Sequence, residues 1–450
     1  MPSSASAPRI GLHTRIGLPT ATAIVVGNMV GFGVFTSLGW QLLSFSSGFV
    51  LLMLWVAGGL YALMGAVCNA ELAAAFPRSG GEYHLLGKVF HPAVGFVSGW
   101  LSVSVGFAAP IALAATVFAG NLTGALGSDS PIVSAALACG VIVFVSAFHV
   151  GTLKVGGAFQ NVFTSLKLVL IVVLIGSAFA LAPAQPLSFL PGEGDFGALL
   201  GGSFAFNLIF VTLAYSGWNA AVYIADEIED PERNVLRALV IGTLIVTALY
   251  VLLNAAFLHS APIDALRKDP GNEHQPEVSL IAATYIFGEV GGRLMGLLIS
   301  LGLVSSISAM VWAGPRVALT MGTDYPALRW LARTSEAGIP VTAIVLQAVI
   351  AMSFVLLAPF LAVWVFVELA FLLSLSATVA GVIWLRIREP ELPRPYRAWG
   401  YPATPIVFLA MNVFIIANTL RDPDQLATVI SSFAVLAVGA LLYPLVRARS

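Results

Sequence analysis

The sequence is dominated by long apolar runs separated by short polar segments. The runs are about 20 residues long, which is the length an α-helix needs to cross the hydrocarbon core of a bilayer. They occupy residues 19–43, 49–76, 93–120, 131–148, 159–182, 198–224, 236–258, 278–315, 341–358, 361–385, 405–419 and 427–446. This pattern predicts an all-α polytopic membrane protein with about twelve membrane-spanning helices, the eighth run being long enough to include turns outside the membrane.

The composition excludes several other classes of protein. Of the 450 residues, 58% are hydrophobic and 10% are charged, whereas soluble proteins carry about 25% charged residues. The net charge of −1 and the lack of a basic run argue against nucleic-acid binding. The sequence contains no HExxH motif, no metal-type cysteine cluster and no Walker A motif. We therefore expect a protein that is not an enzyme, needs no metal or cofactor, and uses a gradient or exchange rather than ATP.

The Lys and Arg residues are distributed unequally between the two sides of the membrane. If the N-terminus is cytoplasmic, most of them fall in cytoplasmic loops, and the outside carries Arg267, Lys268, Arg293 and Arg421. Short cytoplasmic loops of membrane proteins are enriched in Lys and Arg. The sequence therefore predicts a multi-pass plasma-membrane protein, in a bacterial inner membrane, with both termini cytoplasmic. Residues 1–18 form the N-terminal tail in this interpretation, without a cleaved signal peptide.

Two apolar runs are interrupted in a way that disfavours a continuous helix. Gly27, Gly31 and Gly33 lie close together in the first run, and each glycine costs a helix about 1 kcal/mol relative to alanine. The sixth run is interrupted at residues 214–219, Ala-Tyr-Ser-Gly-Trp-Asn. Unwound backbone is tolerated in a bilayer only where it is buried in protein or lines a cavity. Close helix packing is the alternative explanation, but paired interruptions in the two halves of a chain indicate a transporter's substrate site.

Two such breaks have the chemistry to bind an α-amino acid. The N-terminus of a half-helix offers unpaired N–H groups and a partial positive charge, which suit a carboxylate. The C-terminus of the preceding half-helix presents free carbonyl groups, which suit an ammonium group. Glycine-rich backbone can therefore recognise both ends of a zwitterion without a charged side chain.

Lys167 lies about two helical turns inside the fifth apolar run. A lysine at the bilayer centre costs roughly 2.5–3.5 kcal/mol on insertion scales unless it snorkels or finds partners. Snorkelling to the cytoplasmic interface is one interpretation. The other is an ammonium group that faces the bundle interior and binds carbonyl groups freed by the first break. There its charge would replace a bound cation, or it would release a proton.

Two cytoplasmic segments carry further signals. Residues 76–83 combine Pro and Gly residues with Ser79 and Glu82 at capping-box spacing, which predicts a short helix. Glu71, at the end of the second run, is interpreted as structural, with Arg78 as a candidate partner. The segment after the sixth run is dense in charge, and includes Asp226, Glu227, Arg233 and Arg237. A solvated loop and an inner gate whose ion pairs break as the pathway opens explain this segment equally well.

Together these motifs resemble those of the amino acid–polyamine–organocation (APC) transporter superfamily. Residues 27–35 are similar to its first-helix pattern G-x-x-I/V-G-S-G-I/V-F, and residues 76–83 to its P-K/R-S-G-G-E-Y turn. Residues 214–234 resemble A-Y-x-G-W-N followed by E-E/I-x-N/D-P-x-R-N. The spacing from Gln160 to Lys167 and the segment RPYRAWGYP at 394–402 also match. The matches cover residues 20–420 and most resemble the L-type amino acid transporter branch and its bacterial relatives.

The resemblance implies a LeuT-like fold, with a 5+5 inverted repeat and two extra helices. The transporter core would comprise residues 19–390, with the first repeat at about 19–183 and the second at about 198–388, and residues 391–450 would form the appended helices. The implied substrate site has backbone amides for the carboxylate at Gly31, Phe32 and Gly33, and carbonyl groups for the ammonium at Met29, Leu213 and Ala214. The same segment supplies Ser216, Gly217 and Asn219. Lys167 matches a lysine that replaces a sodium site.

Three departures from the family pattern limit what the resemblance implies. Phe32 stands where the family usually has Ser, so its bulk reshapes the pocket. Leu213 falls where relatives often place an aromatic lid over the substrate. The loop at residues 121–130 lacks the cysteine by which animal L-type relatives join an accessory glycoprotein, so we expect no such partner.

The sequence as a whole predicts a secondary active transporter of neutral L-amino acids. The resemblance implies sodium independence and alternating access, with exchange or proton-coupled symport as the energy source. No acidic residue is evident at either break, which disfavours cationic amino acids and polyamines as substrates. A channel and a non-transporting amino acid sensor are the alternatives from other classes.

Overall fold

The structure is a computed structural model that describes residues 16–76, 80–128, 130–151, 153–223, 228–269, 277–336 and 338–447, without the side chains of residues 151–161. Its helices are α1 (Leu18–Met29), α2 (Gly33–Gln41), α3 (Gly48–Ala75), α4 (Gly81–Val89), α5 (Pro92–Leu101), α6 (Ala108–Leu126), α7 (Pro131–Gly151), α8 (Leu153–Leu181), α9 (Asp195–Ala198), α10 (Gly202–Ala214), α11 (Ala220–Tyr223), α12 (Pro231–Ser260), α13 (Ile263–Leu266), α14 (Val278–Asp324), α15 (Val341–Leu357), α16 (Phe360–Arg388), α17 (Ala403–Leu420) and α18 (Leu426–Arg447). A π-helical segment, η1 (Ser102–Gly106), joins α5 to α6, and the short 3₁₀ segments are η3 (Pro326–Ala332) and η4 (Pro423–Gln425).

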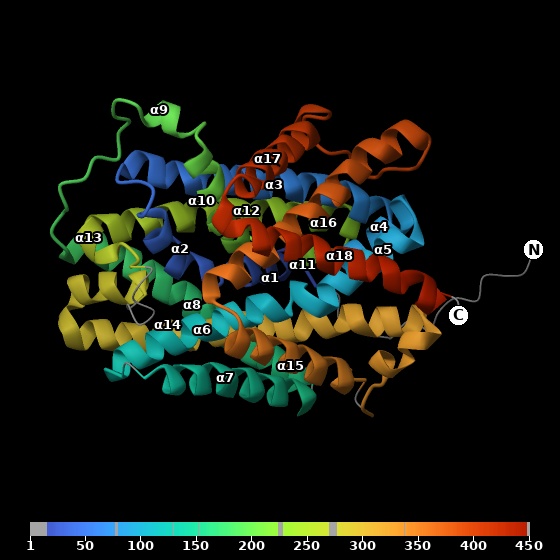
Figure 1. The fold of residues 1–450 in the computed structure, drawn as a ribbon, viewed down its shortest axis with the longest axis horizontal. Helices are drawn as coiled ribbons and strands as arrows, with labels where there is room; N and C mark the ends of the chain where they lie inside the picture. The colour runs from blue at the N-terminus through green and yellow to red at the C-terminus, as the bar shows by residue number, and fades with distance from the viewer. Residues whose placement is uncertain are drawn as a thin grey trace, which may run out of the picture.

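The long helices run side by side along the longest axis of the molecule (Figure 1). The short helices α9 and α13 lie at one end of this bundle, and α4 lies toward the other end (Figure 1). Many apolar side chains on the outside of the bundle are exposed, such as Ile132 at 80% and Leu357 at 82%. An apolar exterior of this kind faces lipid rather than water.

The prediction of an all-α polytopic membrane protein is confirmed. Within the described residues, nine helices are long and apolar enough to cross a membrane, or ten if the bent pair α1 and α2 counts as one span. The apolar helices α10 and α15 are shorter, with 13 and 17 residues. The expected number of twelve spans is therefore not established by helix length and composition. The eighth apolar run lies in α14, which consists of two helical segments joined at a kink at Gly288, where φ is 73°.

Helix ends follow local sequence signals. The Ser47 side chain accepts a hydrogen bond from the amide of Val50 at 3.3 Å and caps α3. Pro92 and Pro231 begin α5 and α12, where the missing proline N–H has no intrahelical partner in any case. The short cytoplasmic helix expected after residue 79 is present as α4, with Gly80 as its N-cap. Ser79 itself lies outside the described residues, so its capping role stays a prediction.

Small residues bring α12 close to α1, which ends at the first break, and to α3. A Cβ atom added to Gly242 of α12 would lie 2.7 Å from Val25 Cγ1 of α1, and one added to Gly59 of α3 would lie 2.4 Å from Thr247 of α12. Real Cβ contacts are not this short, so glycine is needed at both positions for this packing. The close approach places Tyr250, one turn beyond Thr247, against the interior of the bundle, where it is 0% exposed.

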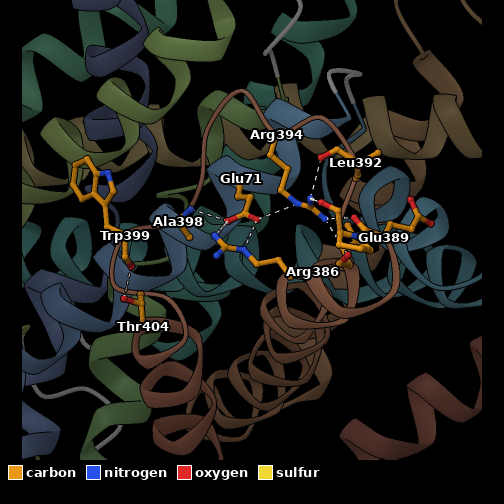
Figure 2. Close-up of polar contacts among 10 residues, drawn as sticks. Glu71, Arg386, Glu389, Leu392, Arg394, Ala398, Trp399 and Thr404 are labelled. Atoms are coloured by element: carbon orange, nitrogen blue, oxygen red, sulfur yellow. Dashed lines mark hydrogen bonds and ion pairs between the residues drawn. The ribbon is translucent and has the colours of Figure 1, made fainter.

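Glu71 is the centre of a buried ionic cluster that ties α3 to the end of α16 and to the segment after it (Figure 2). Its carboxylate accepts two hydrogen bonds from Arg386, at 2.9 and 2.6 Å, and one from the backbone amide of Ala398 at 2.7 Å. Arg394 lies 3.5 Å from the same carboxylate and donates to four backbone carbonyl groups between residues 385 and 392. The structural role expected for Glu71 is present, but with these partners, and Arg78 lies outside the described residues.

We expect Glu71→Gln to destabilise the fold by about 3–5 kcal/mol, because it leaves the charges of Arg386 and Arg394 uncompensated in a buried position. The measurement is thermal unfolding of purified protein in detergent. Glu391→Gln is the control, since Glu391 is exposed in the same segment. Equal unfolding temperatures for the two variants would contradict the prediction.

Candidate functional site

The first predicted break is present in the structure. Helix α1 ends at Met29 and α2 begins at Gly33, with a bend of 41° between them. Within the described residues, the backbone amides of Gly31, Phe32 and Gly33 donate to no backbone carbonyl group. The start of α2 therefore presents free N–H groups, which is the arrangement that binds a carboxylate at a helix N-terminus.

The second break is also present and lies directly against the first. Helix α10 ends at Ala214, and the chain turns through Gly217, where φ is 94°, before α11 begins at Ala220. A Cβ atom added to Gly217 would lie 2.9 Å from the carbonyl oxygen of Asn28, and one added to Gly33 would lie 2.5 Å from Cβ of Ala214. The two breaks are thus in van der Waals contact, backbone against backbone.

The Lys167 ammonium is buried at the first break. The side chain of Lys167 is 1% exposed. Its Nζ donates to the carbonyl oxygens of Gly27, at 3.2 Å, and of Val30, and to the Ser306 hydroxyl at 3.1 Å. The lysine therefore does not snorkel. Its charge occupies a set of oxygen ligands at the end of α1, between α8 and α14.

A small cavity lies beside this lysine. It has a volume of about 10 Å³ and is lined by apolar side chains together with the Lys167 stem, among them Phe35, Leu170 and Ile299. This is about the space of a single water molecule. An amino acid is much larger, so this cavity cannot hold one.

Tyr250 of α12 is a residue of this site that the sequence did not reveal. Its hydroxyl donates to the carbonyl oxygen of Met29 at 2.7 Å and lies 3.0 Å from that of Ala214. The Gly31 amide faces the same hydroxyl. Met29 and Ala214 are two of the three carbonyl groups expected to bind a substrate ammonium, and Tyr250 bridges them across the two breaks. The third, that of Leu213, accepts the amide of Ser216 at 3.0 Å.

Phe32 and Leu213, the two departures from the family pattern, are both buried. The Phe32 ring meets Trp364 of α16 edge to face, with 5.1 Å between ring centroids. Trp364 in turn lies 5.5 Å from Phe210 of α10. Leu213 is 2% exposed. Aromatic side chains from α2, α10 and α16 thus pack beside the breaks, and the bulk that Phe32 adds is accommodated by α16.

Asn219, at the end of the second break, faces the short helix α4. Its amide donates to Oε1 of Glu82 at 2.5 Å, and the Tyr223 hydroxyl donates to Oε2 of the same carboxylate. Glu82 is 8% exposed. This contact closes the side of the breaks that faces α4. Of the residues suggested as an inner gate, Asp226 and Glu227 lie outside the described residues, and Arg233 and Arg237 are exposed in the first turns of α12.

The chain matches a known protein family over nearly its whole length. The family described as "Amino acid permease" matches residues 16–443, which is nearly the whole chain. The chain belongs to the amino acid permease family. This confirms the resemblance to APC superfamily transporters found in the sequence.

Individual relatives of this permease are named amino acid transporters. It is 26% identical to the b(0,+)-type amino acid transporter 1 of Mus musculus over 421 residues, covering 92% of this chain and 84% of the relative. It is 27% identical to the serine/threonine exchanger SteT of Bacillus subtilis, covering 91% and 92%. It is 25% identical to the large neutral amino acids transporter small subunit 2 of Oryctolagus cuniculus, covering 96% and 80%. These relatives are transporters, which confirms that the permease is not an enzyme.

We expect Tyr250→Phe to destabilise the permease by about 1–3 kcal/mol, because the buried carbonyl groups of Met29 and Ala214 lose their shared donor. The measurement is the unfolding temperature in detergent. Tyr285→Phe is the matched control, since Tyr285 is 49% exposed on α14. If both variants unfold at the wild-type temperature, the hydroxyl does not hold the two breaks together.

Proposed function

We propose that this permease is a secondary active transporter of neutral L-amino acids that works by alternating access, by exchange or by proton-coupled symport. The observation that carries the proposal is the contact between two broken helices of opposite polarity. The amides of Gly31, Phe32 and Gly33, which donate to no backbone carbonyl group within the described residues, suit a carboxylate, and the carbonyl groups of Met29 and Ala214 suit an ammonium. The names of two relatives, a serine/threonine exchanger and a large neutral amino acids transporter, agree with it.

We propose sodium independence, and the position of Lys167 supports it. Backbone carbonyl groups and a hydroxyl are the hard oxygen ligands that small cations prefer. The Lys167 ammonium already occupies such a set at Gly27, Val30 and Ser306. A second cation there would be repelled by the ammonium charge, so we propose that Lys167 is the permanent substitute for a coupling cation.

The runner-up proposal is transport of cationic amino acids or polyamines, and Glu82 is the observation that favours it. This carboxylate lies on the α4 side of the second break. Its two oxygens accept hydrogen bonds from Asn219 and Tyr223, and Glu82 is 8% exposed, so its partners in this conformation are protein groups and it is largely shielded from a substrate cation. We therefore keep neutral amino acids as the substrate class.

The remaining features of the proposal concern the chain in its membrane. We propose cytoplasmic termini, repeats at residues 19–183 and 198–388, an inner gate that includes Arg233 and Arg237, and no accessory glycoprotein. Movement of the first, second, sixth and seventh spans, which are α1 with α2, α3, α10 with α11, and α12, against the remaining helices would open the site to each side in turn.

The test is uptake of labelled alanine, serine, leucine and arginine into proteoliposomes that contain the purified chain alone. We expect saturable uptake of the neutral amino acids, stimulated by internal unlabelled substrate and indifferent to sodium. Uptake that does not saturate and shows no counterflow would indicate a channel. Binding without flux would indicate a sensor, and a preference for arginine would favour the runner-up.

A further inference from the structure

Glu368 is a buried carboxyl group in α16 that neither the fold nor the proposed substrate site uses. Its side chain is 2% exposed. It lies one helical turn after Trp364, so the two side chains share a face of α16. Trp364 contacts Phe32 at the first break and donates from Nε1 to the carbonyl oxygen of Ile209 in α10, at 3.4 Å. Glu368 therefore lies on the face of α16 that packs against the candidate substrate site.

The hydroxyl of Thr212 on α10 faces the Glu368 carboxyl group. Thr212 lies two residues before Ala214, where α10 ends. Its Oγ1 donates its proton to the carbonyl oxygen of Leu208 at 2.7 Å. A hydroxyl has a single proton, so toward Glu368 its oxygen is left as an acceptor. A protonated carboxyl group can donate to that oxygen, whereas a carboxylate would need the Thr212 hydroxyl to turn away from the Leu208 carbonyl group.

Two further polar groups complete the surroundings of Glu368. The Tyr61 hydroxyl of α3 lies near the carboxyl group, with the side chain of Asn412 from α17 beside it. Within the part of the chain that the structure describes, Tyr61 Oη and Asn412 Oδ1 make no hydrogen bond. Next to Glu368 there are thus polar atoms that can still form hydrogen bonds, but among these groups there is no positive charge to balance a carboxylate.

Within the described residues, no cation on the helices packed around α16 forms an ion pair with Glu368. Its neighbours are α3, α4, α6, α10, α17, α18 and η1. Helices α6, α10 and α17 and segment η1 contain no Asp, Glu, Lys, Arg or His. The titratable and charged residues on the other three neighbours, besides Tyr61, are Cys68, Glu71, Glu82, Tyr83, His84, Lys88, Tyr443 and Arg447. Among the described residues none of these forms an ion pair with Glu368.

We propose that Glu368 is a proton-binding site that couples amino acid transport by this permease to the pH gradient. The proposal rests on the proposed transport function. Of the two modes proposed there, exchange and proton-coupled symport, it favours symport. An isolated charge buried in a membrane protein is costly, and the neutral acid is far less so. While α10 packs against α16, the Glu368 carboxylate oxygen therefore holds a proton. When α10 moves away from α16 and water reaches Glu368, the proton leaves the carboxyl group. In each transport cycle, Glu368 therefore takes up one proton on one side of the membrane and releases it on the other, together with one amino acid.

The test compares exchange with accumulation in proteoliposomes. A gradient of about one pH unit supplies enough free energy for tenfold accumulation if one proton moves with each solute. For the wild type we expect alanine accumulation when the outside is acidic, and counterflow without a gradient. Glu368→Gln, which resembles the protonated acid, is expected to keep counterflow and to lose the accumulation. The control is Glu289→Gln, an exposed acid on α14 that should change neither.

The outcomes separate the two proposals. No counterflow of any amino acid by the wild type contradicts the transport function itself. Two outcomes overturn the proton site at Glu368. One is wild-type counterflow without acid-driven accumulation, and the other is accumulation by Glu368→Gln equal to that of the wild type. In the second case another group couples transport to the pH gradient. If Glu368→Gln loses counterflow as well, infrared spectroscopy of the folded proteins decides. We expect a protonated-carboxyl band in the wild type at neutral pH that shifts on addition of alanine and is missing from the variant. Its absence from the wild type overturns the proposal.

Discussion

Lys167→Ala is expected to insert and fold but to lose at least about 99% of its amino acid uptake, which corresponds to a cost of roughly 3 kcal/mol. The ammonium donates to two carbonyl groups at the end of α1 and to one hydroxyl of α14. Hydrogen bonds that involve a charged group contribute about 1.5–3 kcal/mol each. Without the hydrogen bonds to the two carbonyl groups, the end of α1 is no longer held in position between α8 and α14. The measurement is the initial rate of counterflow in proteoliposomes, normalised to the amount of folded protein.

Two variants control for other causes of a loss. Lys88→Ala removes a lysine of the same type from an exposed position on α4, and its uptake should match the wild type. Lys167→Met keeps most of the volume of the side chain and removes the charge, so it should be as inactive as Lys167→Ala if the charge matters. Normal turnover in either Lys167 variant would show that the ammonium fills space and does not substitute for a coupling cation.

The sequence predicted both breaks, and the structure contains them where the glycines are. Glycine residues destabilise the helix that contains them whatever lies around it, so a cluster of glycines can be recognised from the sequence of that helix alone. Lys167 was found for a similar reason, because a charge in an apolar run is conspicuous whatever lies around it. What the sequence left open was the direction in which the side chain points, and the buried contact with Val30 excludes snorkelling.

The residues that the sequence missed are those whose importance depends on a distant neighbour. Tyr250 is one aromatic residue among many until the packing of α12 against α1 places its hydroxyl on Met29. Glu71 and Arg386 are 315 positions apart in the chain, so Arg78 was the nearer candidate partner. Glu368, like Lys167, is a charged residue in an apolar run and is equally conspicuous in the sequence, but only the packing of α16 against α10 connects it with the breaks.

Gly33→Ala is expected to abolish transport and to lower stability by about 1–3 kcal/mol, which is the usual cost of inserting a methyl group into a well-packed interior. The added Cβ would lie 2.5 Å from Cβ and 2.7 Å from Cα of Ala214. A backbone atom cannot rotate away as a side chain can, so the two breaks must separate. Uptake and unfolding temperature should therefore fall together.

Gly31→Ala provides the matched comparison, because the same methyl group meets open space there. The nearest atom to an added Cβ is the carbonyl oxygen of Met29 at 3.8 Å, an ordinary contact. We expect stability within about 1 kcal/mol of the wild type, with substrate affinity reduced at least tenfold, since the methyl group lies beside the amides proposed to bind the carboxylate. Gly31→Val should extend this to a complete loss of binding. Affinity is measured by protection of the purified protein against thermal unfolding by alanine, and retained affinity in Gly31→Val contradicts the carboxylate site.

A second change at Ala214 tests whether contact between the breaks is the cause of the Gly33→Ala defect. Ala214→Gly removes the Cβ atom that the new methyl group would strike at 2.5 Å but leaves the Cα atom at 2.7 Å. The double variant should therefore recover part of the lost stability, and a coupling energy of this kind is expected only for residues in contact. If the effects of the two changes on stability are strictly additive, the two breaks do not touch. Their contact could then not close the site. A substrate must enter between the same two backbones. If the double variant recovers stability but not uptake, the contact between Gly33 and Ala214 stabilises the closed state. Transport would then need glycine at position 33 so that the substrate can come close to the backbone there.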